Sequence, residues 1–341
     1  MRTRIDSPGE ADYWLGDMSG PSPAHGLIRF QPLYMDRVWG GRLLETRYGR
    51  RLPDPALPYG ESWEVVDRPG GQSVVSGGPF GGLTLHDLWT KHRAEIFGGA
   101  APESDRFPLL IKILDARDTL SLQVHPPAAE AAALHGEPKT EMWVIAAAAP
   151  GAAIYAGVIP GTTRENFAAA LADGTAAALV PKLAVQEGDF IFIPSGRLHA
   201  IGAGLLIFEI QQNSDTTYRV FDWNRPGLDG KPRALQVEES LRCIDFTDTS
   251  PSLGKPDPDG LLVTCECFTV HRRQAAPGAA VPLGQPGQFL LPGVLSGQLA
   301  CGSATLQPGD WALVPAPAAA AGRQATAGPE GAVWLEVGFG S

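Results

Sequence analysis

The chain has few cysteines, few charged residues and no long hydrophobic run. Its 341 residues include four cysteines, none in a C-x-x-C pair, so we expect reduced thiols. Charged residues make up 19% of the chain, and the formal net charge of −10 without a basic run argues against nucleic-acid binding. No apolar stretch reaches transmembrane length, and the polar N-terminus lacks the apolar core of a signal peptide. We therefore expect a cytoplasmic protein with neither a nucleic-acid nor a membrane partner.

Glycine and proline, by contrast, are abundant. The 41 glycines and 31 prolines produce frequent turns, which favours many short strands over long helices. Helical patterns cover residues 83–97, 163–179 and 236–246. Strand patterns cover 60–65, 109–114, 121–124, 141–146, 190–193 and 205–211. The fold class is therefore predicted to be mostly β, with a few accessory helices.

A short pattern occurs twice in the chain. Residues 188–194 and 309–315 both read Gly-Asp, then four further residues, then Pro. The first copy leads to His199, whereas the matching position after the second copy is Ala320. This repeat predicts two related β-barrels, of which only the first keeps a polar site.

The domain organisation follows from this repeat and from a change in composition. The stretch 247–260 is polar and rich in proline and glycine, as expected of a linker. We expect a flexible N-terminal leader over residues 1–26 and a catalytic barrel with accessory helices over residues 27–250. Residues 251–341 are expected to form a C-terminal barrel that lacks a metal site.

Four metal-ligating side chains are predicted to converge from three strands. Gln123 and His125 lie two residues apart on one strand and therefore share a face. Glu141 opens a second strand, and His199 follows the tight turn after a third. Two imidazoles with an amide and a carboxylate suit Zn²⁺, and Mn²⁺, Co²⁺ or Fe²⁺ also fit this set. The sequence thus predicts one bound divalent metal ion.

Several motifs resemble those of a known family. The stretch from Gly188 to His199 is similar to the metal motif of the cupin superfamily. The following segments together resemble the type I phosphomannose isomerases of bacteria: Arg37-Val38-Trp39-Gly40-Gly41, Gly60-Glu61-Ser62-Trp63-Glu64, Leu120 to Pro126, Lys139 to Trp143, His199 to Gly202 and Gln211 to Val220. This resemblance covers roughly residues 27–250 and continues weakly to the C-terminus.

The resemblance carries expectations about fold, chemistry and residues. The family has a double-cupin fold with one zinc per chain, and it interconverts mannose 6-phosphate and fructose 6-phosphate. Its zinc ligands carry over to Gln123, His125, Glu141 and His199, its active-site arginine to Arg219 and its active-site lysine to Lys139. Longer members have a tyrosine where this chain has Ile201, and they also carry a helical insertion. Both differences indicate the short bacterial form.

The chemistry of aldose–ketose isomerisation fits these residue types. A proton moves between C1 and C2 through a cis-enediolate, whose oxygens need positive charge nearby. Lys139 is a candidate acid or base because it shares a strand face with Glu141, and Glu209 is an alternative base. The planar fork of Arg219 suits a phosphate or vicinal hydroxyls. Further candidates are Ser121 and Arg225 for the phosphate and Asp215 for substrate binding and for orienting Arg219.

Other functions remain open on the sequence alone. A cupin that binds a metal and a sugar, or that regulates, without turnover is one alternative, and an isomerase of a different sugar or phosphosugar is another. A redox dioxygenase fits poorly, because such enzymes favour histidine-rich ligand sets with open positions. The predicted partner is a small phosphosugar substrate, and the chain is expected to be a monomer or a homodimer.

Overall fold

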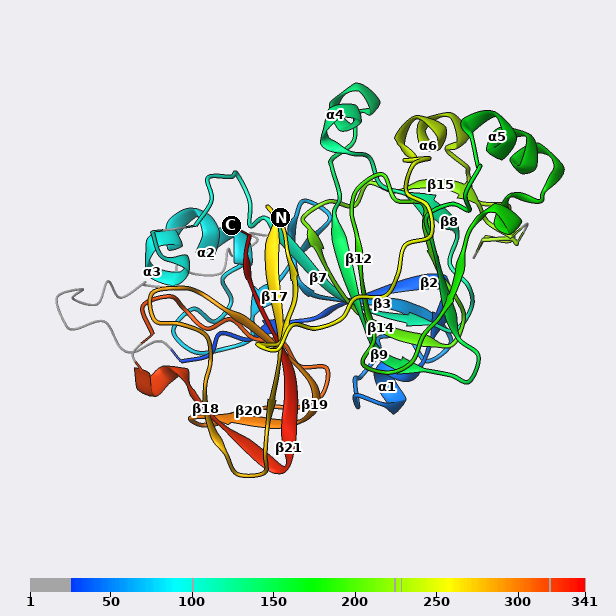
Figure 1. The fold of residues 1–341 in the computed structure, drawn as a ribbon. Helices are drawn as coiled ribbons and strands as arrows, with labels where there is room; N and C mark the ends of the chain where they lie inside the picture. The colour runs from blue at the N-terminus through cyan, green and yellow to red at the C-terminus, as the bar shows by residue number, and fades with distance from the viewer. Residues whose placement is uncertain (1–25, 100, 224, 228, 319, 341) are drawn as a thin grey trace, which may run out of the picture.

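Three β-sheets of five or six strands form the body of the protein (Figure 1). The predominance of strands confirms the predicted fold class, mostly β with a few helices. The computed structural model describes residues 26–99, 101–223, 225–227, 229–318 and 320–340. The leader predicted over residues 1–26 therefore lies outside the described residues, apart from Gly26.

The strands of each sheet come from distant parts of the chain. The five-stranded sheet has the order β11 (Lys182–Ala184), β10 (Ala153–Ala156), β13 (His199–Ile201), β8 (Leu122–Val124) and β15 (Tyr218–Phe221). The middle sheet has the order β12 (Phe190–Ile193), β9 (Glu141–Ala148), β14 (Leu205–Gln212), β7 (Leu109–Ala116), β2 (Leu33–Gly41) and β3 (Tyr59–Val65). The C-terminal sheet has the order β16 (Leu261–Thr264), β17 (Phe268–Ala275), β21 (Gln324–Phe339), β19 (Leu291–Cys301) and β20 (Ala304–Leu306), and β18 (Ala280–Pro282) also pairs with β21. Two short pairs join β1 (Phe30–Gln31) to β6 (Val74–Val75) and β4 (Asp67–Arg68) to β5 (Gly71–Gln72).

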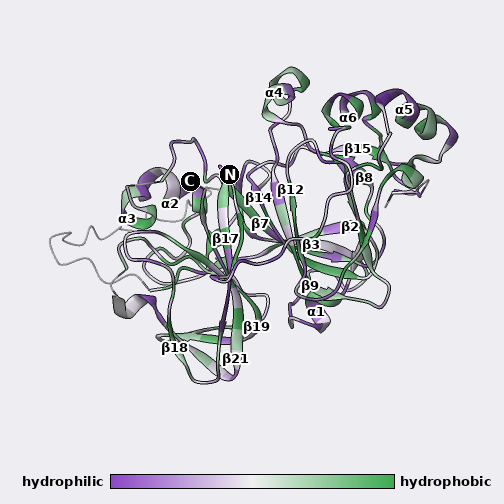
Figure 2. Cartoon of the chain, in the orientation of Figure 1, coloured by the Kyte–Doolittle hydropathy of each residue, from purple (hydrophilic) through white to green (hydrophobic). Residues whose placement is uncertain are grey.

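The middle sheet is buried on both faces. Along β14, the even-numbered residues 206–210 join a hydrophobic cluster with β17 and β21 of the C-terminal sheet. Leu205 and Ile207 point the other way and pack with β10 and β13 of the five-stranded sheet. Glu209 continues this second face, so the space between the middle and five-stranded sheets is apolar at one end and polar at the other. Figure 2 shows the hydrophobic strands gathered in the interior.

Helices cover the outer face of the five-stranded sheet. Phe167 of α5 (Arg164–Asp173) packs with Leu122 and Val124 of β8, and α6 (Val237–Cys243) contributes to the same cluster. Because side chains alternate along a strand, the residue between Leu122 and Val124 must face the opposite side. The hydrophobic pattern of β8 therefore directs the side chain of Gln123 toward the space between the five-stranded and middle sheets.

The pattern predicted as one helix over residues 83–97 forms two helices. Thr84 caps α2 (Leu85–Lys91) with a capping box. The chain leaves helical geometry at His92, and α3 (Arg93–Phe97) then begins. Both helices lie beside the C-terminal sheet (Figure 1).

The remaining helices are short. The pattern predicted over residues 163–179 also divides, because Gly174 ends α5 with a left-handed C-cap (φ 79°). The other short helices are α1 (Leu43–Thr46), α4 (Ala128–Ala131), η1 (Ala132–Leu134), η2 (Ala176–Leu179) and η3 (Ala320–Arg323).

The segment predicted as a linker, residues 247–260, is packed against the N-terminal part of the chain. Asp248 forms an ion pair with Arg197 at 2.6 Å, and the backbone N–H of Gly254 donates to the carbonyl of Phe190. The C-terminal sheet also shares a hydrophobic cluster with the middle sheet. The N-terminal and C-terminal parts of the chain therefore share one hydrophobic core, and the segment that connects them is packed rather than extended.

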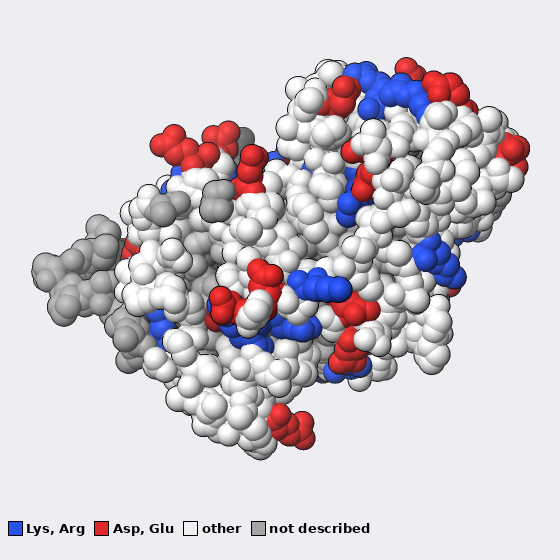
Figure 3. Space-filling view, viewed as in Figure 1, with Lys and Arg blue, Asp and Glu red and all other residues white. Residues whose placement is uncertain are grey.

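The surface is weakly charged on the face shown in Figure 3, where acidic and basic side chains are interspersed among uncharged ones. The four cysteines are free thiols. Within the described part of the chain, no helix combines the length and the hydrophobicity that crossing a bilayer requires.

Candidate metal centre and active site

The structure brings the four predicted ligands together between the five-stranded and middle sheets. His199 opens β13 directly opposite Gln123 of β8, and His125 follows the end of β8. Glu141, the first residue of β9, reaches them from the middle sheet. Its two carboxylate oxygens lie 3.3 Å from His125 Nε2 and 3.7 Å from His199 Nε2. Gln123 Nε2 lies 3.3 Å from His199 Nε2, so the fourth side chain adjoins His199.

Both imidazoles are oriented with a nitrogen lone pair toward this point. The Nδ1 of His125 bonds to the carbonyl of Thr216 at 2.9 Å, and the Nδ1 of His199 bonds to the carbonyl of Arg197 at 2.8 Å. Since a carbonyl can only accept, each Nδ1 carries the proton and each Nε2 is left unprotonated. Backbone partners of this kind fix the tautomer that a metal-binding histidine requires.

The buried atoms of this cluster fit a cation. His125 Nε2 and both oxygens of Glu141 are buried and have no hydrogen-bond partner among the described residues. Burial of a carboxylate without hydrogen bonds is costly, and a metal ion at this point would satisfy all three atoms. Two imidazoles and a carboxylate fit one Zn²⁺. They form the one group of at least three such side chains among the described residues.

The protonation states agree with metal binding. Burial and the charge of Lys139 lower the pKa of His125 to about 3, so this imidazole is neutral near pH 7. Burial alone would raise the pKa of Glu141, but Lys139 and the imidazole of His125 hold it well below the usual range. Lys139 Nζ lies 3.0 Å from the carboxylate of Glu141, an ion-pair distance without hydrogen-bond geometry.

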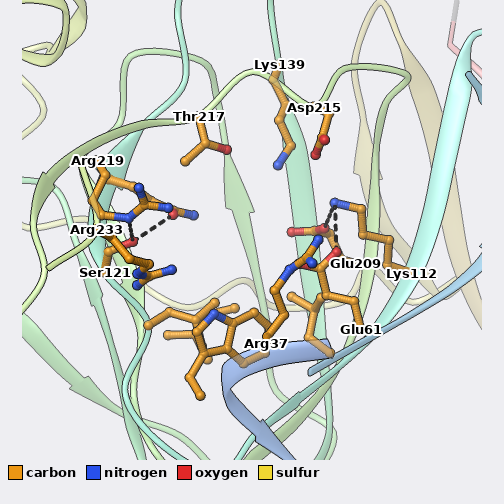
Figure 4. A pocket seen from close by; sticks show the side chains of 15 residues that line it. Arg37, Glu61, Lys112, Ser121, Lys139, Glu209, Asp215, Thr217, Arg219 and Arg233 are labelled. Carbon is orange, nitrogen blue, oxygen red and sulfur yellow. Dashed lines mark hydrogen bonds and ion pairs between the residues drawn. The ribbon is translucent and has the colours of Figure 1, made fainter. Parts of the chain in front are cut away.

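A cavity of about 370 Å³ opens beside the metal centre (Figure 4). On one side, Glu209 forms an ion pair with Lys112 at 3.3 Å and accepts a hydrogen bond from Trp143. Lys112 also lies 3.9 Å from Glu61, which pairs with Arg37 at 2.7 Å. These charged side chains form one connected network on the middle-sheet wall.

Two carboxylates of this network differ in acidity. Burial and the negative charge of Glu141 raise the pKa of Glu209, although Lys112 and Lys139 oppose the shift. Burial would also raise the pKa of Glu61, but Lys112 and Arg37 lower it to about 2. Glu61 is therefore a fixed anion, whereas Glu209 is the carboxylate with the stronger affinity for a proton.

The opposite side of the cavity is cationic. Arg219 lies on β15 beside Gln123, donates from Nε to Ser121 Oγ at 3.2 Å and donates from Nη1 to the carbonyl of Ala234 at 3.1 Å. It forms no ion pair within 4.0 Å with a carboxylate of the described chain. Burial and the charge of Arg233 lower the pKa of Arg219. Arg219 and Arg233 therefore both offer positive charge to this end of the cavity (Figure 4).

Two predicted residues lie elsewhere than expected. Asp215 does line the cavity, but it faces Lys139 across from Arg219, so the predicted role in orienting Arg219 is wrong (Figure 4). The partners of Arg219 are Ser121 and a backbone carbonyl instead. Arg225 does not line the cavity and is bound to Asp222 and to the carbonyl of Thr119. The chain turns back after β15, which spacing along the sequence does not reveal.

Four charged cavity residues were not indicated as site residues by the sequence: Arg37, Glu61, Lys112 and Arg233. Arg37 and Glu61 do fall within the segments that carry the family resemblance. A lone charged residue in the apolar run 109–114 was a usable signal for Lys112, because a buried lysine needs a partner. Arg233 had no such signal.

Known proteins are similar to this chain in sequence and in structure. A family model described as the phosphomannose isomerase type I catalytic domain matches residues 27–142. A mannose-6-phosphate isomerase of Streptococcus mutans is 39% identical over 281 residues, covering 79% of this chain and 86% of that protein. The chain belongs to the type I phosphomannose isomerase family. A crystal structure of the family member from Bacillus subtilis agrees, with a TM-score of 0.79 at 32% identity over 92% of this chain and 99% of that one.

More distant members of the family share the fold. A zinc-bound mannose 6-phosphate isomerase has a TM-score of 0.72 over 93% of this chain and 100% of that one, at 17% identity. The predicted resemblance to the family is thereby confirmed, and the fold extends over both the N-terminal and the C-terminal part of the chain.

Proposed function

We propose that the cavity binds the open-chain form of a hexose 6-phosphate and moves a proton between C1 and C2 through a cis-enediolate. By its family the protein is a metal-dependent mannose-6-phosphate isomerase, which interconverts mannose 6-phosphate and fructose 6-phosphate. One observation carries the assignment in this chain: buried ligand atoms that have no hydrogen bond lie beside a cavity whose wall also carries the guanidinium groups of Arg219 and Arg233. A metal and the phosphate of one substrate could thus be held in the same cavity.

The ligands we assign to the metal are Gln123, His125, Glu141 and His199. When bound, a divalent ion polarises the substrate carbonyl and stabilises the developing oxyanion without a redox step. The carbonyl partners of the two histidines keep the imidazoles in place, so that these side chains need not rearrange when a metal binds.

Glu209 and Lys139 are the proposed proton-transfer groups. Glu209 lines the cavity, and its raised pKa brings it closer to the working pH of a general base. Lys139 is charged, because Glu141 and Glu209 raise its pKa against the effect of burial. We assign the removal of the carbon-bound proton to Glu209 and the protonation of a substrate oxygen to Lys139. Asp215, beside Lys139, is a candidate for a sugar hydroxyl.

The phosphate is proposed to lie against Arg219 and Ser121. The hydroxyl of Ser121 already accepts from Arg219, and charge-assisted hydrogen bonds to phosphate are the strong ones. Arg225, the other predicted phosphate ligand, is engaged by Asp222 outside the cavity wall.

The test is a coupled assay with mannose 6-phosphate on protein whose metal content has been measured. We expect turnover that stops on chelation and returns with Zn²⁺. Bound metal and phosphosugar without turnover would support a binding or regulatory module instead. Turnover of a different sugar, phosphorylated or free, would change the assigned substrate but leave the assignment as an isomerase in place.

The assignment of the base has its own test. Glu209→Gln keeps the shape of the side chain but removes the basic oxygen. We expect this variant to retain metal and to lose both turnover and the exchange of the substrate C1 or C2 proton with deuterated solvent. Exchange at the wild-type rate would exclude Glu209 as the base.

We also propose the wider organisation predicted from the sequence. Residues 27–250 would form the catalytic unit, and residues 251–341 would form a barrel without a metal site. The repeated Gly-Asp turn supports this division. A cytoplasmic location is proposed on the free thiols, and a monomer or homodimer is proposed as the assembly.

A further inference from the structure

We propose that the C-terminal part of the chain holds a second ligand site, which takes a small planar aromatic molecule that carries one anionic group. The site is a cavity of about 600 Å³ on the face of the C-terminal sheet that points away from the middle sheet. This size falls within the range of about 300 to 1,000 Å³ that is typical of small-molecule sites. The inference goes beyond the proposed isomerase and does not depend on it, because the described residues that line this cavity differ from those of the first.

Residues on one face of β17 and β21 form a wall of this cavity. The two strands pair side by side (Figure 1), and three facing pairs line the cavity: Thr269 with Gly338, His271 with Glu336, and Arg273 with Trp334. The residues between them, among them Val270 and Leu335, belong to the core shared with the middle sheet. Trp334 is also part of the apolar cluster inside the C-terminal part, so the cavity begins where that packing ends.

Three phenylalanines add an aromatic wall. Phe97 comes from the end of α3, Phe289 from the segment between β18 and β19, and Phe339 from the end of β21. The ring centroids of Phe289 and Phe339 lie 4.1 Å apart, and those of Phe97 and Phe289 lie 5.6 Å apart. Phe97 and Phe289 are packed in the shared core, so this wall is formed before a ligand binds. Aromatic rings bury large apolar areas against one another, which favours a planar aromatic ligand here.

Glu336 organises the polar part of the cavity. It is 5% exposed, and its carboxylate accepts from Arg273 Nε at 3.1 Å, from Trp334 Nε1 at 3.2 Å and from the backbone N–H of Gly284 at 3.4 Å. A buried carboxylate with three donors has its hydrogen-bonding needs met by the protein. Glu336 therefore holds Arg273 and Trp334 in place on the cavity wall.

The donors that remain in this part of the cavity suit an anion. Arg273 uses Nη1 for the carbonyl of Asp259, and its Nη2 has no partner among the described residues. His271 likewise forms no hydrogen bond or ion pair within the described part of the chain. Burial and the charge of Arg273 lower the pKa of His271, so its ring is neutral near pH 7 and one nitrogen can donate. A carboxylate of the ligand would accept from both side chains, with a charge-assisted bond from Arg273.

Gly338 leaves space for the ligand. A Cβ atom at this position would meet no atom within 4 Å, and the backbone is not in the left-handed region. Because side chains alternate along β21, a side chain at this position would point into the cavity beside Glu336. The cavity can therefore be filled from Gly338 without strain in the backbone.

Calorimetric titration of the zinc-loaded, full-length protein with 2-naphthoate tests this site. We expect a Kd of about 0.1 to 1 mM, as is reasonable for a ligand of this size. The Kd should be the same in saturating mannose 6-phosphate, because the two cavities are separate. The neutral analogue 2-naphthylmethanol should bind about 5- to 30-fold more weakly, because it lacks the charge-assisted hydrogen bond.

Two variants locate the probe within the structure. Gly338→Leu should raise the Kd of 2-naphthoate by about tenfold or more, because its side chain occupies the cavity. Gly77→Leu is the matched control and should keep the Kd within about twofold, since Gly77 is equally open and does not line the cavity. His271→Ala should raise the Kd by about 3- to 10-fold, the effect of one lost hydrogen bond. Metal content and melting temperature are measured for each variant to separate misfolding from lost binding.

Each contrary outcome is specific. A wild-type protein that shows no binding up to about 5 mM 2-naphthoate overturns the proposal, and so does displacement of the probe by mannose 6-phosphate. Binding within twofold of wild type in folded Gly338→Leu would place the probe elsewhere, and equal affinity for the alcohol would remove the anionic group from the ligand class. Should Gly338→Leu fail to fold, His271→Ala decides, because it breaks no hydrogen bond of the described chain. A protein that binds 2-naphthoate as expected but does not turn over mannose 6-phosphate would overturn the proposed function alone.

Discussion

The N-terminal and C-terminal parts of the chain contain the same turn but bury different interiors. In the first copy, the backbone N–H of Gln186 donates to Asp189 Oδ2 at 2.8 Å, and in the second that of Gln307 donates to Asp310 Oδ2 at 3.0 Å. The glycine inside each turn adopts φ near 90° (90° and 87°), a conformation that favours glycine. The agreement in hydrogen bonds and dihedral angle supports the internal repeat beyond its sequence pattern.

Beyond this turn the two interiors diverge. The N-terminal interior buries seven titratable side chains around the cavity among the described residues: Glu61, Lys112, His125, Lys139, Glu141, His199 and Glu209. The C-terminal interior is filled mainly by aliphatic side chains and Trp334. Burial of charge costs free energy, whereas apolar burial stabilises at about 25 cal/mol per Å². The C-terminal part also covers the back of the middle sheet, so it stabilises the sheet that carries Glu141 and Glu209.

Loss of the metal should produce the largest difference in activity between substitutions in the N-terminal and the C-terminal part. We expect His199→Ala to lose the bound ion and to reduce turnover by roughly 10³-fold or more, because metal catalysis supplies several kcal/mol. The measurement is metal content together with the coupled assay. His271→Ala, a histidine of the C-terminal sheet, is the matched control and should keep metal and activity. A zinc-retaining His199→Ala variant would contradict the assigned centre.

Loss of Arg219 should separate catalysis from metal binding. We expect Arg219→Ala to keep its zinc and to lower kcat/KM by about 10²- to 10³-fold, as is typical when one electrostatic donor is removed. A normal kcat/KM in a metal-loaded variant would exclude Arg219 from the mechanism. Arg242→Ala serves as the surface control.

Truncation of a side chain in the C-terminal core should lower the stability of the protein without changing its activity. Leu299 is fully buried in the apolar cluster, so Leu299→Ala is expected to lower the free energy of unfolding by about 2–5 kcal/mol. The KM and the metal content should be unchanged at temperatures where the variant is folded. Denaturant titration gives the first quantity, and lost zinc in the folded variant would show that the two interiors are coupled.

Buried charge should make the N-terminal part sensitive to pH. Burial raises the pKa of Asp115 to about 6, and its carboxylate accepts a hydrogen bond from the backbone of Leu43 in α1. The folded state therefore binds more protons than the unfolded state between about pH 4 and 6, and this group's contribution to stability falls as pH rises. Asp115→Asn should gain stability relative to the wild type over that range, by at most about 3 kcal/mol. Melting temperatures that run parallel across this pH range would contradict the raised pKa.

The smallest expected difference lies between the two repeated turns. Asp189→Ala should cost about 1 kcal/mol, the value of a typical lost hydrogen bond. Asp310→Ala should cost slightly more, because Asp310 also pairs with Arg29 at 2.9 Å and lies 3.7 Å from Arg50. Parallel denaturant titrations of the two variants measure the difference, and a larger cost at Asp189 would count against equivalent turns.

Local sequence patterns were enough to predict the side chains that cluster at the candidate metal centre, the main strands and the family. Gln123 and His125 share a face because side chains alternate along a strand, and the turn after β12 brings His199 round to them. These are local rules, so they can be applied without knowing which strands pair. The capping box at Thr84 could be predicted for the same reason.

The division of the cavity and the contacts between the two parts of the chain became visible only in the folded structure. Arg233 enters the cavity, and Arg225 stays outside it, because the chain returns after β15 and Asp222 binds both. Asp215 lies beside Lys139, across the cavity from Arg219, although only four residues separate Asp215 from Arg219 in the sequence. The polar segment 247–260 packs against the N-terminal part through the Arg197–Asp248 ion pair and the hydrogen bond from Gly254 to Phe190. Contacts of this kind depend on pairing between distant strands, which no local pattern specifies.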